Sequence, residues 1–234
     1  MEPQGLYNRN PMNLITLGFV HSPFIDKFGT PRQSQIAKNS VSELILDKKI
    51  PVETLDGLQK GTFIWVLFGF HLNRQKKPLV KVHPPRLRGK KMGVLATRSP
   101  HRPNPIGLSL ARIEAIYKNK ITVTGLDVVH GTPFYDIKPY LPAYDRPQGK
   151  QVLWTKEAPF EKLKVRFALR SLEPIDPTQR PLFKKQLREI LCEDPRPLAY
   201  LEKVSHTYWL HYGKWDVGFH IHKEQVLVIE LKPA

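Results

Sequence analysis

Most of the chain shows short apolar runs or alternating apolar and polar positions, a pattern typical of β-strands. Residues 62–70 form an aromatic and β-branched run that predicts a strand buried on both faces. Residues 121–129 predict another strand, which would form a hairpin with the segment before it. That preceding segment, residues 108–117, fits either a strand or a helix. Further strands are expected at residues 14–20 and 43–46. The first part of the chain therefore predicts a mainly β domain.

The pattern changes after residue 171. Residues 181–193 predict a helix, because Pro181 suits a first turn, apolar side chains recur on one face, and Asp194 followed by Pro195 ends the pattern. Residues 162–169 alternate as in a half-buried strand, and short strands are expected at residues 206–212, 217–222 and 225–231. We expect a polar tail at residues 1–13, a mainly β domain at residues 14–171 and a small α+β domain at residues 172–234.

Three polar segments rich in proline or glycine follow the expected strands, at residues 27–33, 97–105 and 130–142. In the central one, three prolines fix φ around Arg98, Arg102 and Asn104. A stiff loop loses little entropy when it binds a ligand, so this segment is predicted to be a binding site. The alternative is a polar surface loop without a function. Polar loops gathered at one end of a barrel would form a concave site on a rigid scaffold.

Positive charge is concentrated around the central segment. The net charge is +16, and between Asp56 and Glu114 there is no acidic residue but there are twelve lysines and arginines. Such a run attracts polyanions, so it favours nucleic acid as a partner over a face that is charged only for solubility. The single cysteine, Cys192, excludes an intramolecular disulfide and a multi-cysteine zinc site. Neither a signal sequence nor an apolar run of membrane-spanning length is seen, so we expect a cytoplasmic protein.

Several familiar sites are excluded by their spacing. No two glycines are separated by a single residue, so the G-x-G-x-x-G fingerprint of Rossmann domains is absent. The Gly-Lys pairs are not followed by Ser or Thr as in a Walker loop, and there is no H-E-x-x-H. Ala111 replaces the second glycine of a G-x-S-x-G nucleophile elbow. Any nucleotide-like cofactor must therefore be bound by another fold.

Three motifs resemble the TsaA-like (TrmO) family. They are residues 93–107, residues 29–33 and residues 131–140, in that family's order and spacing, and residues 194–200 resemble a motif of its C-terminal domain. The resemblance implies an S-adenosyl-L-methionine-dependent tRNA methyltransferase on an antiparallel, non-Rossmann β-barrel. It also implies N6 methylation of the threonylcarbamoyl-adenosine at tRNA position 37, and a homodimer. We expect no metal and no membrane partner.

The resemblance places the cofactor site on three groups of residues. These are Pro31, Arg32 and Gln33; His71, Leu72, Arg98 and Leu108; and His130, Gly131, Thr132 and Pro133. Two positions depart from the family pattern, because Leu72 stands where some relatives carry Gln and His130 where Asp is usual. Leu72 can still offer a backbone group, whereas His130 loses whatever contact the carboxylate made.

Chemical roles can be assigned from the residue types. Arg32 or Arg98 suits the methionyl carboxylate, because a guanidinium binds a carboxylate in a bidentate, charge-assisted way. Asp136 is a candidate catalytic base or orienting group and Lys138 a candidate partner for a substrate anion, although an Asp-x-Lys pair is as often a structural ion pair. Candidate substrate-binding residues are Arg86, Arg88, Lys90, Lys91, Arg102, Asn104 and Tyr140.

Two other functions remain open. A non-catalytic RNA-binding protein would use the same basic face but transfer no methyl group. A small-molecule hydrolase or binding barrel would show affinity that is indifferent to salt, whereas phosphate contacts weaken steeply as salt rises.

Overall fold

The computed structural model describes residues 13–73, 77–84, 87, 89–146, 148–149, 152, 154–157, 162–196 and 206–234. The expected polar tail, apart from Asn13, lies outside these residues. So do Arg86, Arg88 and the last four residues of the 194–200 motif.

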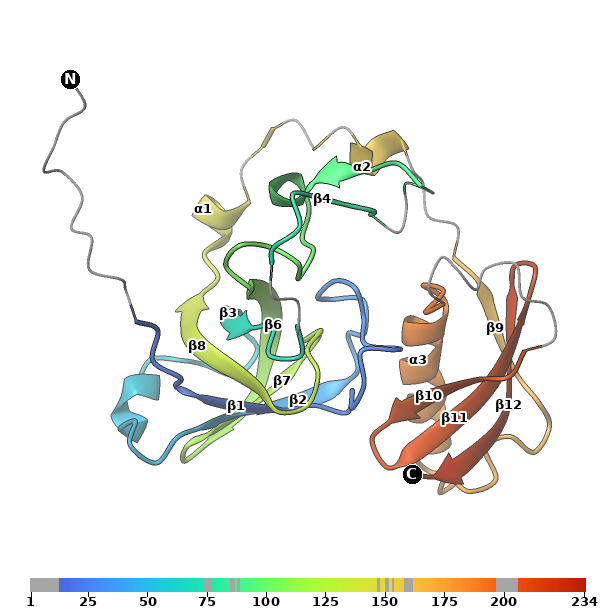
Figure 1. Cartoon of the computed structure of the whole chain (residues 1–234). Coiled ribbons are helices and arrows are strands. Elements are labelled where there is room, and N and C mark those ends of the chain that lie inside the picture. Colours follow the sequence, from blue (N-terminus) through green and yellow to red (C-terminus); the bar gives the residue numbers. More distant parts are fainter. Residues whose placement is uncertain are drawn as a thin grey trace, which may run out of the picture.

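Six antiparallel strands close into a barrel in the order β1, β2, β7, β6, β3, β8 (Figure 1). They are β1 (Gly18–His21), β2 (Val41–Leu46), β3 (Phe63–Gly69), β6 (Ile106–Tyr117), β7 (Lys120–Thr124) and β8 (Thr132–Pro139). Their inward side chains form one apolar core, in which Val20, Leu44, Ile64, Ile121 and Phe134 are fully buried. The predicted mainly β fold with an antiparallel barrel is confirmed.

Two expectations for individual strands were wrong. Strand β3 is buried on one face only, because alternate residues point into the barrel while Trp65 and Leu67 are only partly covered. Residues 130–142 are not a polar loop, since most of them form β8, which pairs with both β1 and β3. The ambiguous segment 108–117 is a strand, part of β6, and forms the expected hairpin with β7.

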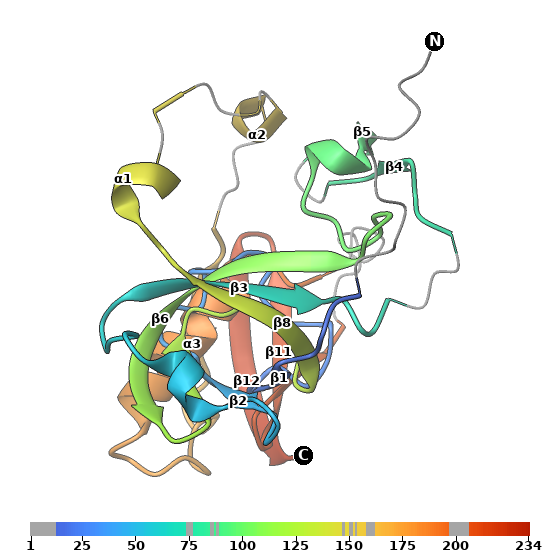
Figure 2. The ribbon, with the colours of Figure 1, turned by 90° about the vertical axis from the view of Figure 1, so that its left-hand side faces the viewer.

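The connection from β3 to β6, residues 70–105, is called the arm. Its described part contains the short strands β4 (Lys81–Val82) and β5 (Met92–Gly93) and the 3-10 turn η3 (Val94–Ala96). Figure 2 shows that these elements project away from the barrel. The short helices α1 (Pro142–Asp145) and α2 (Trp154–Glu157) follow the barrel, and η1 (Val52–Leu55) joins β2 to β3. The indole of Trp154 donates to the carbonyl of Ala96 at 3.1 Å, which ties the arm to α2.

The second domain is a four-stranded sheet covered by one helix. The sheet has the order β10, β11, β12, β9, formed by β9 (Lys164–Phe167), β10 (Tyr208–Tyr212), β11 (Trp215–His222) and β12 (Gln225–Pro233). Helix α3 (Arg180–Leu191) buries Phe183, Leu187 and Leu191 in the core of this domain. The predicted helix and the three C-terminal strands are confirmed. The expected boundary at residue 172 cuts off β9, which is bonded in parallel to β12.

The connection from β1 to β2, residues 22–40, lies between the barrel and α3 (Figure 1). It is called the β1–β2 segment. Phe24 and Ala37 of this segment are buried in the core of the second domain rather than in the barrel.

Candidate functional site

The barrel brings three connections to one of its ends. Neighbouring strands are antiparallel, so the end of one strand lies beside the start of the next. Val20 pairs with Thr132, Gly69 with Ile106, and Val41 with Thr124. The β1–β2 segment, the arm and the β7–β8 turn (residues 125–131) therefore leave the barrel at the same end. These connections carry most of the polar residues expected to bind the cofactor.

The arm and the β1–β2 segment meet through Arg98 and Gln33. Arg98 Nη1 donates a hydrogen bond to Gln33 Oε1 at 2.7 Å. A guanidinium has five N–H donors, so this bond orients the group without exhausting it. The side chain of Arg98 is exposed, and an oriented, accessible guanidinium can bind a carboxylate.

A second contact joins His71 to Thr132. The hydroxyl of Thr132 donates to the carbonyl of Val129 at 2.7 Å and lies 3.3 Å from His71 Nδ1. Because the single hydroxyl proton is used on Val129, His71 Nδ1 is the donor in this pair. Partial burial, and then the charge of Lys27, lower the pKa of His71. His71 is therefore neutral at pH 7, with Nε2 as an acceptor.

The carbonyl of Leu72, expected to be available to the cofactor, is bonded within the protein. It accepts a hydrogen bond from Lys27 Nζ at 2.6 Å. This bond fixes the start of the arm to the β1–β2 segment.

His130 stacks on His21, with the ring centroids 5.0 Å apart. The backbone N–H of His130 donates to the carbonyl of Phe24 at 2.7 Å, and the N–H of Gly131 donates to the carbonyl of Val20 at 2.8 Å. Gly131 has a φ of +75°, and a Cβ added there would meet nothing within 4 Å. The turn is thus anchored on one side and open on the other, so a ligand can approach its backbone closely. Pro133 lies within β8, opposite Phe19 of β1.

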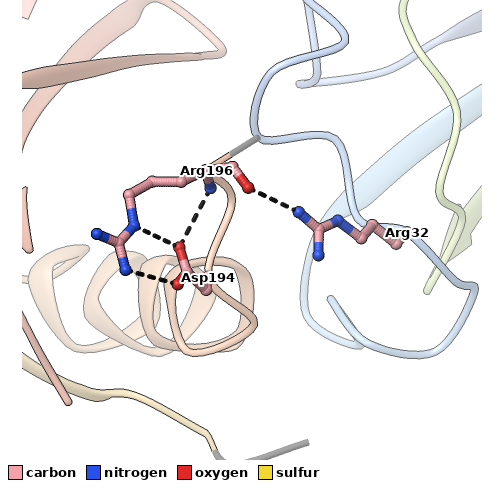
Figure 3. A network of polar contacts seen from close by, with 3 residues as sticks. All are labelled: Arg32, Asp194 and Arg196. Carbon is pink, nitrogen blue, oxygen red and sulfur yellow. Dashed lines mark hydrogen bonds and ion pairs between the residues drawn. The ribbon is translucent and has the colours of Figure 1, made fainter. Parts of the chain in front are cut away.

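Arg32 points to the second domain. Its Nη2 donates to the carbonyl of Arg196 at 3.1 Å (Figure 3). Arg32 and Arg98 were both proposed to bind a carboxylate. The hydrogen bond of Arg98 to Gln33 lies at the barrel end, whereas that of Arg32 leads to the second domain. Pro31 is buried and lines a cavity of about 80 Å³ between the β1–β2 segment and Pro195.

Leu108 and Asp136 lie on the outer face of the barrel. Leu108 on β6, Leu67 on β3 and Asp136 on β8 occupy directly opposed positions across the three strands. At about 4.8 Å per strand, Asp136 is roughly 10 Å from Leu108. Leu108 is 50% exposed and offers an apolar surface to a ligand.

Asp136 and Lys138 form an ion pair. Lys138 Nζ lies 2.9 Å from Asp136 Oδ2, and both side chains are substantially exposed, at 66% and 40%. Asp136 Oδ1 also accepts the backbone N–H of Ile137 at 2.9 Å. The two residues therefore form the structural ion pair that was the alternative to a catalytic role.

The structure does not bring Lys138 and Tyr140 to the residues that meet at the barrel end. A strand advances about 3.4 Å per residue, so Lys138 in β8 and Tyr140 just after it lie roughly 20 Å or more along the chain from Thr132. The ring of Tyr140 packs edge-on against Phe63 and Trp65, near the other end of the barrel. These two positions were expected in a loop, and the strand separates them from the residues at the barrel end.

Asp127 was not among the expected site residues. Its Oδ1 accepts a hydrogen bond from the hydroxyl of Ser109, which lies next to Leu108 in β6. Burial raises the pKa of Asp127 to about 6, against smaller opposing effects of the Ser109 bond and the charge of Arg98. The only sign of it in the sequence is a single carboxylate within the apolar run of residues 121–129.

The arm presents the expected substrate-binding residues at its surface. Lys90, Lys91 and Asn104 are exposed, and Arg102 Nη1 donates to the carbonyl of Thr97 at 3.1 Å. Arg86 and Arg88 lie outside the described residues. The exposed cations fit a nucleic-acid interface.

Other features of the described residues do not add to this site. A cavity of about 370 Å³ opens beside Val165 and Cys192 of the second domain, away from the expected site residues. Within the described ranges, the histidine, cysteine and acidic side chains form no group of three placed to hold a metal ion. In the same part of the chain, every helix is too short or too polar to cross a membrane.

Comparisons with known proteins identify the family and agree with the fold. The sequence model of the tRNA-methyltransferase O N-terminal domain matches residues 19–146. The chain is 37% identical over 226 residues to a tRNA (adenine(37)-N6)-methyltransferase of Escherichia coli, covering 88% of this chain and 94% of that protein. The chain belongs to the tRNA-methyltransferase O family.

Relatives of this family differ in length. A human tRNA (adenine(37)-N6)-methyltransferase is 48% identical over 142 residues, which are 58% of this chain and 32% of the human protein. The chain spans about a third of the mammalian relatives it matches. The crystal structure of TrmO from Pseudomonas aeruginosa superimposes with a TM-score of 0.78 at 26% identity, over 95% of this chain and 99% of that one.

The residues at the barrel end fit S-adenosyl-L-methionine. Arg98 offers a guanidinium for a carboxylate, Leu108 an apolar surface, and His71 an acceptor nitrogen. The open space at Gly131 admits a ligand close to the backbone. A zwitterionic amino acid joined to an adenosyl group carries the complementary chemistry.

Proposed function

We propose that this chain is an S-adenosyl-L-methionine-dependent tRNA methyltransferase that acts on N6 of adenine 37. The observation that carries the proposal is the meeting of Arg98 with Gln33 and of His71 with Thr132 at one end of the barrel. The Escherichia coli relative, matched over 94% of its length, bears this activity in its name. The basic arm leaves the barrel at the same end, which supports a nucleic-acid surface beside the residues proposed to bind the cofactor.

The chain itself contributes binding and orientation. S-adenosyl-L-methionine supplies a methyl group on a sulfonium, and in-line transfer to nitrogen depends mostly on alignment of donor and acceptor. Arg98, held by Gln33, binds the carboxylate, and neutral His71 accepts a hydrogen bond from the ligand through Nε2. The turn at Gly131 provides close backbone contact.

We further propose that the substrate adenosine carries a threonylcarbamoyl group and that the enzyme acts as a homodimer. The sequence motifs support both proposals, and the exposed Leu95 and Leu108 offer apolar surface for a partner subunit. An acylated N6 is a weak nucleophile and must lose its proton, for which Asp136 remains the proposed base. Its ion pair with Lys138 would have to open to allow this. The cytoplasmic location stays a prediction.

The test is transfer of label from methyl-labelled S-adenosyl-L-methionine to tRNA, followed by nucleoside analysis by mass spectrometry. We expect label on N6 of adenine 37 in tRNA bearing the threonylcarbamoyl group and none in tRNA that lacks it. Asp136→Asn should reduce transfer and leave cofactor affinity unchanged, and full activity of that variant would dismiss the base assignment. Salt-dependent tRNA binding without any transfer would instead support the non-catalytic RNA-binding alternative.

A further inference from the structure

The β1–β2 segment is built into the second domain as well as the barrel. Apart from an isolated bridge at Phe24, its described residues form turns and bends rather than strands or helices. Phe24 and Ala37 are nevertheless only 1% exposed, within the core of the second domain. An irregular loop with buried apolar residues takes its shape from what it packs against. Here that partner is the second domain.

Both ends of the segment are fixed by hydrogen bonds to that domain. At one end, the N–H of Gly213 donates to the carbonyl of Pro23 at 2.8 Å. At the other, the hydroxyls of Ser40 and Tyr212 are 2.9 Å apart, and Asn39 bonds to Glu189 of α3 through its side chain and its backbone N–H. The residue after β10 thus holds the first end of the segment, and β10 and α3 hold the second end.

The middle of the segment is held by close packing. Phe28 stacks on Phe219 with the ring centroids 6.4 Å apart. Gly29 has a φ of +86°, and a Cβ added there would lie 1.8 Å from Cδ1 of the fully buried Leu210. The backbone therefore approaches the sheet of the second domain too closely for any side chain at this position.

A largely buried ion pair just after α3 completes this contact. Asp194 has a φ of +44°, so the chain turns sharply after the helix. Its carboxylate accepts from Arg196 N at 3.2 Å, from Nε at 2.9 Å and from Nη2 at 2.8 Å (Figure 3). The two side chains are 16% and 8% exposed. The bidentate bond to Asp194 raises the pKa of Arg196 further, and together these bonds fix the backbone at residue 196.

The carbonyl of Arg196 is the acceptor for Arg32, as Figure 3 shows. Arg32 is followed directly by Gln33, whose side chain orients Arg98. A continuous series of contacts therefore runs from Asp194 through Arg196 and Arg32 to the residues proposed to bind the cofactor. The ion pair at the start of this series is largely buried, whereas Arg32 and Arg98 are exposed.

We infer that the second domain positions the cofactor-binding segment, and that Asp194 is a positioning residue which sets the affinity for S-adenosyl-L-methionine. The inference rests on the proposed function. It differs from a purely stabilising interface, because a stabilising interface would affect unfolding without affecting the affinity of the folded protein.

The test compares Asp194→Ala with a control that destabilises the same domain elsewhere. Val226 is fully buried in the core of the second domain, on β12, and Val226→Ala removes apolar contacts there without touching the ion pair. Melting temperature and calorimetric affinity for S-adenosyl-L-methionine are measured on the full chain at a temperature where all variants are folded. We expect Asp194→Ala to weaken cofactor binding about tenfold, as loss of one oriented charged contact would. Val226→Ala should change affinity less than twofold, even with an equal loss of melting temperature.

A second variant, Asp194→Asn, keeps the inference testable if Asp194→Ala does not fold. Asn tolerates a positive φ and keeps an acceptor for Arg196, so this variant should fold and bind with an affinity between those of wild type and Asp194→Ala. In methyl transfer, Asp194→Ala should raise KM for S-adenosyl-L-methionine about tenfold and change kcat less than twofold. Equal affinities of wild type and both Asp194 variants would overturn the inference. Failure of the wild type to bind S-adenosyl-L-methionine would refute the proposed function instead.

Discussion

The β1–β2 segment and the arm both supply residues to the candidate site, but they are held in opposite ways. The segment buries Phe24 and Ala37 in the second domain, whereas the arm leaves Val80 and Leu95 exposed at 82% and 75%. The arm also carries exposed cations without acidic neighbours in the sequence. In the proposed function, the rigid part serves the small cofactor and the exposed part serves a large, flexible polyanion. Substitutions can test whether this division holds.

The largest effect is expected at Gly29, compared with Gly89 in the arm. Both glycines have a positive φ, +86° and +95°, but an added Cβ meets Leu210 at Gly29 and nothing within 4 Å at Gly89. Gly29→Ala should lower the free energy of unfolding by about 3 kcal/mol, the sum of a backbone cost of about 1 kcal/mol and overpacking against Leu210. Gly89→Ala should cost about 1 kcal/mol. Equal losses in denaturant unfolding would show that the segment is no more tightly packed than the arm.

A second test concerns Asp127, near the place where Arg98 of the arm meets the segment. Its pKa is raised by burial to about 6, so the folded chain keeps a proton that the unfolded chain loses above about pH 4. The contribution of Asp127 to the free energy of unfolding is therefore fully present below about pH 4 and is lost as the pH rises to about 6. Asp127→Asn should remove this loss, which amounts to up to about 3 kcal/mol between pH 4 and pH 7. Parallel curves of unfolding free energy against pH for both proteins would contradict the assignment.

The next largest effect is expected at Arg98, whose hydrogen bond to Gln33 links the arm to the β1–β2 segment. Arg98→Ala should weaken binding of S-adenosyl-L-methionine by about 1.5 to 3 kcal/mol, the value of a lost hydrogen bond to a charged group. Arg102→Ala is the matched control, because its guanidinium bonds to Thr97 within the arm. Calorimetric titration should show a cofactor affinity close to wild type for this control. Unchanged affinity of Arg98→Ala would remove Arg98 from the site.

Much of the fold could be predicted from the alternation of residues, and the errors have physical causes. Strand β8 was taken for a loop because Gly131, Pro133 and Pro139 usually interrupt strands. The structure places both prolines near the ends of the strand, where fewer ladder bonds are lost. Strand β3 was expected to be buried on both faces because its outward residues are also apolar. An apolar run does not distinguish a strand buried on both faces from a barrel strand, whose outer face stays partly open.

The site could be predicted as far as its residues lie in local motifs. The bonds that assemble it join distant positions, such as Arg32 with Arg196, 164 residues apart. No periodicity in the sequence encodes such a pair. Asp127 was missed for a different reason, since one carboxylate in an apolar run follows the pattern of a strand rather than of a site. Its contact with Ser109 exists only because β6 passes beside it in the barrel.

The smallest effect is expected from the lysines of the arm. Lys90→Ala together with Lys91→Ala should reduce the slope of log affinity for tRNA against log salt by about 2, since each lost phosphate contact removes about one unit. Binding of S-adenosyl-L-methionine should not change, because these exposed side chains are not among those that meet at the barrel end. Lys48 and Lys49 are a matched adjacent pair, exposed just after β2 at the opposite end of the barrel. If their replacement changes the salt slope equally, net charge rather than the arm attracts the tRNA. If only the arm pair changes it, the basic surface is confined to the side of the molecule where the cofactor residues meet.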